Sequence, residues 1–298
     1  AKDTANHTAI LRNGNPNVQA KLRSQGGVGA AAWLDARPVA PELRIPGNLF
    51  VVGLRYRSIL PMPFGDRHCP GATCGAQLDQ WGYHLLACPF TGRKRWRCMG
   101  LEKAFVKIFI EAGGKAKPNV PIGSLQVAGV DRNDQRRLDG VGWGLPLFDG
   151  VKVVMDATIR APLTSNGLPA LNADRVDGST FVRARYDKKS AYPELHNTHS
   201  CRFLTLACET GGRWSQECEQ LVRGLAKHKG NQYPEALRKS MQLTYTNRFW
   251  CLLSVAALKG IAASLEGIGE IDDTGALLRE PVLEEVLAGC DVPPYASR

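Results

Sequence analysis

Hydrophobic and polar positions along the chain follow a helical period in three segments and a strand-like period in others. Residues 215–230 predict a helix that begins at a Ser N-cap and stops at Gly, and residues 233–267 predict a long apolar helical segment with one break. Two β-like runs within 136–159 flank the turn signal PLFDG, and residues 201–210 (CRFLTLACET) predict a further strand. Residues 101–112 have the spacing of an amphipathic helix that ends at a Gly pair. Its apolar positions are Leu101, Ala104, Phe105, Ile108, Phe109 and Ala112.

This order of helices and strands predicts an α/β (α+β) core. The N-terminal 65 residues hold many of the Gly and Pro residues, and we interpret residues 1–65 as an extended N-terminal arm. A Cys/His-rich segment over 66–92, a core over 93–230 and a helical C-terminal extension over 231–298 would follow, with an acidic, Pro-rich tail after Gly267 at the periphery. In the arm, residues 48–60 suggest a helix with an inward face made of Phe50, Val51, Leu54, Ile59 and Leu60.

The charge of the chain indicates what kind of partner it binds. The chain has 38 Lys and Arg against 28 Asp and Glu, a net charge of +10, which favours contact with a polyanion such as nucleic acid over surplus surface charge. No long uninterrupted apolar window predicts a membrane span, and the polar N-terminus has no signal-peptide core, so we expect an intracellular protein that is not secreted. Free thiols in a reducing compartment are expected, as small buried hydrophobes, at Cys98, Cys201, Cys208, Cys218 and Cys251.

Four soft-metal ligands gather in CPGATCGAQLDQWGYHLLAC, residues 69–88. Zinc prefers four such ligands in a tetrahedron, usually as two pairs, and a site with all four positions filled is structural rather than catalytic. The alternative is coincidence in a Cys-rich chain, with His68 as a spare ligand. The predicted zinc ligands, spaced Cys-x4-Cys-x9-His-x3-Cys, are Cys69, Cys74, His84 and Cys88.

Two acids lie on the β-like runs around PLFDG. If residues 146–149 form a four-residue loop, Asp139 faces Asp156, and directly opposed carboxylates can share a divalent ion such as Mg²⁺. A two-residue turn at 149–150 would shift the register and separate them. The alternating glycines at 140, 142 and 144 leave one face of the first run bare, which suits close approach by a ligand or a packed helix.

Further candidate residues follow the two runs. Lys188 and Lys189 lie in a basic stretch, and a Lys beside metal-bound carboxylates can polarise an attacked phosphate or help to deprotonate water. Glu209, at the end of the strand over 201–210, is another acid for this site, although a lone strand acid is more often solvated or salt-bridged. A zinc-dependent enzyme is disfavoured, because the Cys/His ligand set leaves no open position.

The ordered series SQGGVGAAAWLDARP, CPGATC…LDQWGYHLLAC, RRLDG, VVMDATIRAPL, KKSAY and FLTLACETGGRWS resembles the region C-terminal to the reverse transcriptase in certain non-LTR retrotransposons. That region carries a restriction-like endonuclease of the PD-(D/E)XK class beside a CCHC zinc knuckle. The resemblance covers roughly residues 24–230 and implies a PD-(D/E)XK core over 93–230, with the knuckle over 66–92 and the helical C-terminal extension. No YADD-like reverse transcriptase motif occurs in the chain.

Carried over by position, the resemblance assigns Asp139 and Asp156 to the two motif acids and Glu209 to the acid of the strand after the next helix. The Lys is supplied from that helix as Lys188 or Lys189, with Lys188 favoured, since Thr158 stands two residues after Asp156. RRLDG lacks the Pro of the first motif. A Glu expected shortly after the first helix is absent, and the candidate substitutes are Glu102 and Glu111.

The resemblance implies an Mg²⁺-dependent DNA endonuclease that nicks DNA, in the nucleus, with the reverse transcriptase region of the same polyprotein as partner. The alternative is a catalytically inactive, co-opted relative that binds RNA as a structural subunit of a ribonucleoprotein or organellar complex. Contacts to the nucleic-acid backbone are expected from Arg93, Lys94, Arg95, Arg97, Arg183 and Arg185.

Overall fold

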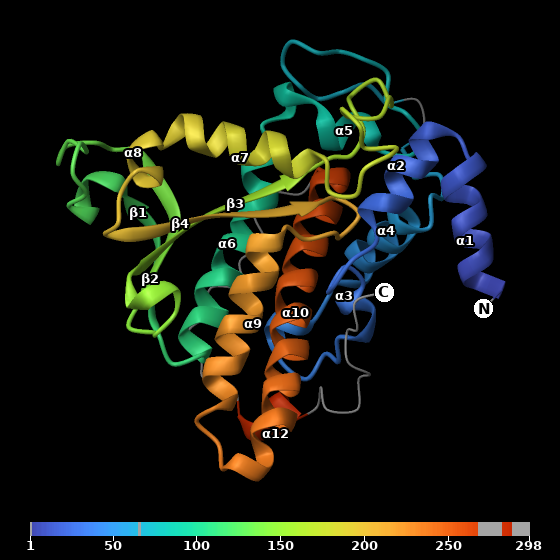
Figure 1. Cartoon of the computed structure of the whole chain (residues 1–298). Coiled ribbons are helices and arrows are strands. Elements are labelled where there is room, and N and C mark those ends of the chain that lie inside the picture. Colours follow the sequence, from blue (N-terminus) through green and yellow to red (C-terminus); the bar gives the residue numbers. More distant parts are fainter. Residues whose placement is uncertain (1, 65–66, 268–281, 288–298) are drawn as a thin grey trace.

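The computed structural model describes residues 2–64, 67–267 and 282–287, with a four-stranded mixed sheet at the centre (Figure 1). The strand order is β1-β2-β3-β4; β2 is antiparallel to both of its neighbours, and β3 is parallel to β4. The expected mixed α/β class is therefore confirmed. The strands are β1 (Lys115–Pro121), β2 (Arg137–Trp143), β3 (Lys152–Arg160) and β4 (Cys201–Glu209).

Helices cover both faces of this sheet. α7 (Thr180–Ala191) makes the crossover between the parallel strands and lies on one face, while three long helices pack on the other (Figure 1). Phe105 and Phe109 of the long helix α6 join Met155 of β3 in one continuous apolar core. The three long helices are α6 (Arg93–Glu111), α9 (Gln216–Gly230) and α10 (Glu235–Glu266).

Most elements of the core agree with the sequence pattern. The six apolar positions predicted for the helix over 101–112 are all buried in α6 and just after it, and α9 begins and ends where predicted. α10 has no break. Strand β1 was not predicted, because KAKPNVP has Lys and Pro where β-branched residues would signal a strand; it is an edge strand, where Pro is tolerated.

The N-terminal segment is not the extended arm that its composition suggested. It forms several helices, and Ala20, Trp33 and Leu49 are buried against the rest of the core. The Trp33 backbone N–H donates to Ser254 of α10, and the Tyr56 hydroxyl shares a hydrogen bond of 2.7 Å with Thr210. The helices are α1 (Lys2–Asn13), α2 (Pro16–Ser24), α3 (Ala32–Asp35), η1 (Pro41–Leu43) and α4 (Gly47–Arg57).

Within α4, the predicted inward face was wrong. Phe50 and Val51 are exposed, whereas Leu49, Val52 and Tyr56 are buried. The four consecutive apolar residues 49–52 point to all sides of one helical turn, so the pattern indicated a helix without defining which side faces the core.

Buried ion pairs fasten the N-terminal segment to α6 and α10. Lys107 of α6 lies 3.3 Å from Glu42 of η1 and 3.1 Å from Glu111, whose carboxylate also accepts a 2.8 Å bond from Arg248. Removing one partner of such a group would leave a buried charge uncompensated. The N-terminal segment over residues 20–56 is therefore part of the folded core.

α10 is also a core element rather than an extension. It is long and apolar enough to cross a membrane by length and composition, but 83 % of its most apolar window is buried inside the fold, as in the central helix of a packed domain. The remaining predicted tail lies outside the described residues, apart from 282–287. The other short elements are α5 (Tyr83–Ala87), η2 (Pro89–Thr91), η3 (Ile122–Leu125), η4 (Phe148–Gly150), α8 (Pro193–His196) and α12 (Leu283–Leu287).

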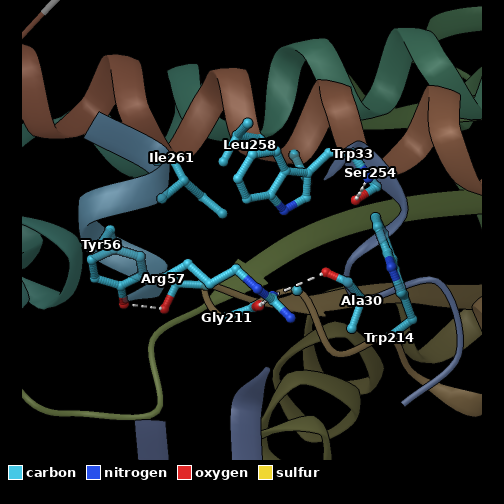
Figure 2. A pocket seen from close by; sticks show the side chains of 13 residues that line it. Ala30, Trp33, Tyr56, Arg57, Gly211, Trp214, Ser254, Leu258 and Ile261 are labelled. Atoms are coloured by element: carbon cyan, nitrogen blue, oxygen red, sulfur yellow. Dashed lines mark hydrogen bonds between the residues drawn. The ribbon is translucent and has the colours of Figure 1, made fainter. Parts of the chain in front are cut away.

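A small cavity lies where the N-terminal segment meets α10 and the end of β4 (Figure 2). The Arg57 guanidinium reaches into it and donates to the carbonyls of Ala30 and Gly211, while Leu258 and Ile261 supply an apolar wall. Its volume of about 20 Å³ suits a single water molecule and no larger ligand. This cavity is a feature of core packing.

Candidate functional site

The first candidate site is the Cys/His group, which we define as Cys69, Cys74, His84 and Cys88. A loop carries the first two residues, α5 carries His84, and Cys88 is the residue directly after α5. The Asp79 carboxylate starts this helix, because it accepts bonds from the backbone N–H groups of Trp81, Tyr83 and His84 at 2.6 to 3.0 Å. Local chain geometry therefore brings the four residues together.

The Cys/His group has the geometry of a closed metal site. Its four candidate ligand atoms all lie within 4.8 Å of one another. The Sγ atoms of Cys69 and Cys88 are 3.8 Å apart, which is the edge of a tetrahedron with zinc–sulfur bonds of about 2.3 Å. Cys74 Sγ lies 3.3 Å from His84 Nε2. The four residues could therefore hold a metal ion such as zinc.

Surrounding groups fit the same role. His84 Nδ1 lies 3.1 Å from the Ser165 carbonyl oxygen, so Nδ1 carries the proton and Nε2 is left to coordinate. Burial raises the pKa of the Cys69 thiol to about 11, so a bound cation would be required to hold it as a thiolate at neutral pH. The five cysteines expected as free thiols are free, and four of them are buried, whereas Cys98 is half-buried.

The second candidate site begins with the register of β2 and β3. The pairs Gly140–Met155, Val141–Val154 and Gly142–Val153 set a register in which Asp139 and Asp156 are the next residues, one on each strand. This is the register of the four-residue loop. The Asp139 carboxylate also accepts a 2.6 Å bond from the backbone N–H of Ala157, which holds the side chain against β3.

The bare face of β2 accommodates a helix. A Cβ placed on Gly142 would lie 2.6 Å from the Phe109 ring, and one on Gly140 would lie 3.3 Å from Val106. Both contacts are to α6, so the glycines allow α6 to approach the strand closely. As a result, α6 can bring its own acid to the two strand acids.

That acid is Glu102, and α7 contributes a lysine. Lys188 Nζ lies 2.6 Å from Asp156 Oδ1, and the Asp156 side chain is 3 % exposed. Glu102 interacts with both Asp139 and Asp156. We call Glu102, Asp139, Asp156 and Lys188 the acidic cluster; its members come from α6, β2, β3 and α7.

Electrostatics in the acidic cluster favour the entry of a cation. Burial first, and then the neighbouring carboxylates of Asp156 and Glu102, raise the pKa of Asp139 to about 9. Burial and the charge of Asp156 also raise the pKa of Glu102. Asp156 Oδ2 is buried and has no hydrogen-bond partner among the described residues. A carboxylate oxygen in that condition is suited to ligating a hard cation.

A cavity of about 570 Å³ opens beside the acidic cluster, between α6, β1 and β2. Glu102 and Asp139 are part of its wall. The rest of the lining combines positive charge with apolar area, and includes Arg95, Met99, Lys103, Val106, Ile110 and Arg137. The two acids therefore face a space with basic walls that is large enough for part of a ligand.

Two predicted catalytic residues lie elsewhere. Glu209 is not brought to the acidic cluster: β3–β4 pairing places it opposite Arg160, four residues along from Asp156, and its carboxylate accepts a 2.7 Å bond from Thr180. Burial raises its pKa to about 7. Lys189 is exposed on α7, whereas Lys188 pairs with Asp156.

The predicted basic contacts are only partly available. Arg97 is buried and donates to the Leu86 carbonyl, so it is a structural residue and cannot reach a polyanion. Arg93 donates to the Ser264 carbonyl, and Arg185 pairs with Glu217. The exposed basic side chains of the predicted set are Lys94, Arg95, Arg183 and Arg185, and of these Arg183 pairs with Asp187 at 2.8 Å.

Sequence reasoning named Glu102 only as a substitute for an absent family acid, and it missed the basic cavity wall on β2 at Arg137. Spacing along α6 alone does not distinguish Glu102 from Glu111; the structure separates them, since Glu111 lies in the buried ion pairs with Lys107 and Arg248.

No protein-family model and no curated protein matches the chain.

Proposed function

We propose that this protein is an Mg²⁺-dependent endonuclease domain of a retroelement, with a PD-(D/E)XK core, and that it nicks DNA by hydrolysing a phosphodiester. The single observation that carries the proposal is the convergence of Glu102, Asp139, Asp156 and Lys188, with Glu102 and Asp139 in the wall of a cavity that also has basic residues. Buried acids with perturbed pKa values beside a cleft are typical of catalytic sites.

In this proposal the acidic cluster holds Mg²⁺. Mg²⁺ prefers carboxylate oxygens, and Asp156 Oδ2 is buried without a partner among the described residues, next to Asp139. When bound, Mg²⁺ would lower the pKa of a coordinated water and neutralise charge on the scissile phosphate. Asp139 would release the proton that its raised pKa lets it hold at neutral pH.

The other side chains have separate roles in this proposal. Lys188, fixed against Asp156, places a positive charge where negative charge develops on the phosphate. Glu102 completes the set of acidic oxygens from α6. Arg95 and Arg137 of the cavity wall bind the DNA backbone through phosphate contacts, which position a strand without reading its sequence.

The Cys/His group, as a zinc knuckle, has a structural role. It lies directly before α6, so a bound zinc ion would fix the loop and α5 beside the helix that carries Glu102. On this proposal the reverse transcriptase region of the same polyprotein is the partner, and the nucleus is the site of action.

A plasmid-nicking assay with and without Mg²⁺ tests the proposal. We expect wild-type protein to nick supercoiled DNA only with Mg²⁺. Mutating a residue that only holds a metal ligand in place typically costs roughly 10- to 100-fold, and Asp156→Asn should lose more activity than that. Glu102→Gln should lose activity similarly. The matched control is Glu209→Gln, which keeps an acceptor for Thr180 and should stay within about threefold of wild type.

Folded wild-type protein that nicks nothing but binds RNA or copurifies with a ribonucleoprotein would overturn the nuclease proposal in favour of the inactive relative. Equal losses in Glu102→Gln and Glu209→Gln would show that the acidic cluster is not the site of the chemistry.

A further inference from the structure

An exposed aromatic side chain lies on α6, the helix that forms one wall of the cavity beside the acidic cluster. Trp96 lies in the first turn of α6 and is 46 % exposed. Its neighbours Lys94 and Arg95 are exposed too. A single exposed apolar residue has little meaning by itself, so the position of this ring relative to the cavity decides its significance.

Helix geometry places Trp96 in line with the cavity wall. Met99 and Lys103 follow Trp96 at i+3 and i+7, so the three share one stripe of α6, and the latter two line the cavity. Arg95 lines the cavity as well. Glu102 is six residues after Trp96, which is about 9 Å along the helix axis. Trp96 therefore lies on the side of α6 that lines the cavity, between Arg95 and Met99.

The positive charges around the Trp96 ring indicate a negatively charged ligand. Lys94 and Arg95 flank Trp96, and Arg137 lies on the opposite wall of the cavity. An aromatic face beside a basic groove is the combination with which proteins bind unpaired nucleotide strands: charges follow the phosphates, and each base offers a π-face to stack on the ring. A fully paired duplex hides its bases and offers only phosphates to the same surface.

We propose that Trp96 stacks on an unpaired base of the DNA strand that enters the cavity, so that the preferred substrate is a duplex with a single-stranded flank rather than a fully paired duplex. This inference rests on the proposed function, because it takes the cavity as the path of a DNA strand. It adds a stacking residue and a substrate class to that function.

The test measures binding rather than cutting. Fluorescence anisotropy, without added Mg²⁺, would compare a labelled blunt duplex with the same duplex extended by a single-stranded flank. We expect Trp96→Ala to weaken binding of the flanked duplex about tenfold and to leave the blunt duplex within about twofold. Trp96→Phe, which keeps a stacking face, should restore most of the affinity. Because the ring is exposed, the melting temperature should not change.

Two further variants make the result specific. Arg95→Gln should weaken both DNAs and reduce the salt dependence of binding, which Trp96→Ala should not. Tyr186→Ala removes an aromatic ring that is 61 % exposed beside Arg183 on α7, away from the cavity lining, and should change neither affinity.

Equal weakening of both DNAs by Trp96→Ala, no weakening of either, or the same selective loss in Tyr186→Ala would overturn the inference. Its failure is distinguishable from that of the proposed function. A wild-type protein that nicks DNA while Trp96→Ala binds normally contradicts only the stacking, and a selective loss of binding in a protein that never nicks contradicts only the nuclease.

Discussion

The Cys/His group closes on itself, whereas the acidic cluster faces a cavity. In the first, four ligand atoms lie within 4.8 Å of one another and the His84 ring is held from behind by a carbonyl. In the second, a buried Asp156 oxygen has no partner among the described residues, and Asp139 and Glu102 line an open space. A closed set stabilises a fold, while an incomplete set beside a cavity can accept a cation and a substrate.

The two sites also differ in how the chain builds them. The Cys/His group comes from residues 69–88, so short loops and one turn of helix suffice. The acidic cluster joins α6, β2, β3 and α7, spanning 102–188. Its geometry therefore depends on the whole sheet and on the glycines that let α6 approach β2. Variants at the two sites should accordingly fail in different ways.

The largest effect is expected from opening the Cys/His group. Cys88→Ser removes one of four ligands of a closed site, so bound zinc should fall from one ion per chain toward none, and the free energy of unfolding should drop by several kcal/mol because metal binding contributes directly to folding. Zinc analysis of the purified protein and thermal melting measure the two quantities. In the same preparations, Asp156→Asn should retain its zinc.

The matched control is Cys201→Ser, which changes a buried cysteine of β4 outside the Cys/His group. It should retain zinc with at most a modest loss of stability. If Cys88→Ser keeps its zinc and melts like wild type, the four residues do not form a structural metal site, and the contrast between the two regions fails.

The second effect concerns pH and the acidic cluster. An unfolded Asp has a pKa near 3.9, whereas burial and neighbouring carboxylates raise that of Asp139 to about 9. Between these values the folded state binds the extra proton, so the stabilisation present below about pH 4 is lost as the pH rises toward 9. Asp139→Asn carries no charge and should be more stable than wild type at pH 8, by on the order of 1–3 kcal/mol.

Urea unfolding at several pH values, without added divalent cations, measures this difference. Mg²⁺ should then stabilise wild type at pH 8 but have much less effect on Asp139→Asn. Asp149→Asn, in the exposed turn between the same two strands, is the control and should follow the wild-type curve. Parallel pH curves for wild type and Asp139→Asn would refute the crowding of carboxylates inferred for this cluster.

The sequence was most informative where spacing acts locally. The four Cys/His ligands follow from their positions alone, and the pairing of Asp139 with Asp156 followed from choosing a four-residue loop. That choice was left open because PLFDG also permits a two-residue turn. The structure has the register of the four-residue loop, because Gly142 pairs with Val153, although β2 ends at Trp143 and β3 begins at Lys152, so that the connection itself is longer.

Packing between distant segments could not be predicted from the sequence in the same way. The N-terminal segment has the Gly and Pro content of an arm, yet Trp33 and Leu49 are buried against α10, which the sequence placed in a separate extension. The choice between Glu102 and Glu111 depends on how β2 packs against α6, which the sequence does not reveal. In each case the deciding contact joins residues far apart in the chain, which periodicity within one segment does not register.

The smallest effect should come from the residue that starts α5. Asp79 contacts no ligand atom but accepts three backbone N–H bonds, one of them from His84, so it positions the histidine within the Cys/His group. Asp79→Ala should cost about 1 kcal/mol of stability, as the loss of a helix cap does. It should also weaken zinc retention against a chelator by roughly tenfold, the scale of an outer-shell change.

Asp79→Asn separates positioning from charge, because its amide oxygen can still accept backbone bonds, and it should recover most of the zinc retention. Neither Asp79 variant should alter nicking by more than about twofold while zinc stays bound, since the acidic cluster comes from β2, β3, α6 and α7 and not from α5. A loss of nicking with zinc fully retained would instead show that the two sites are coupled through the start of α6, and the division into a closed structural site and an open reactive one would have to be given up.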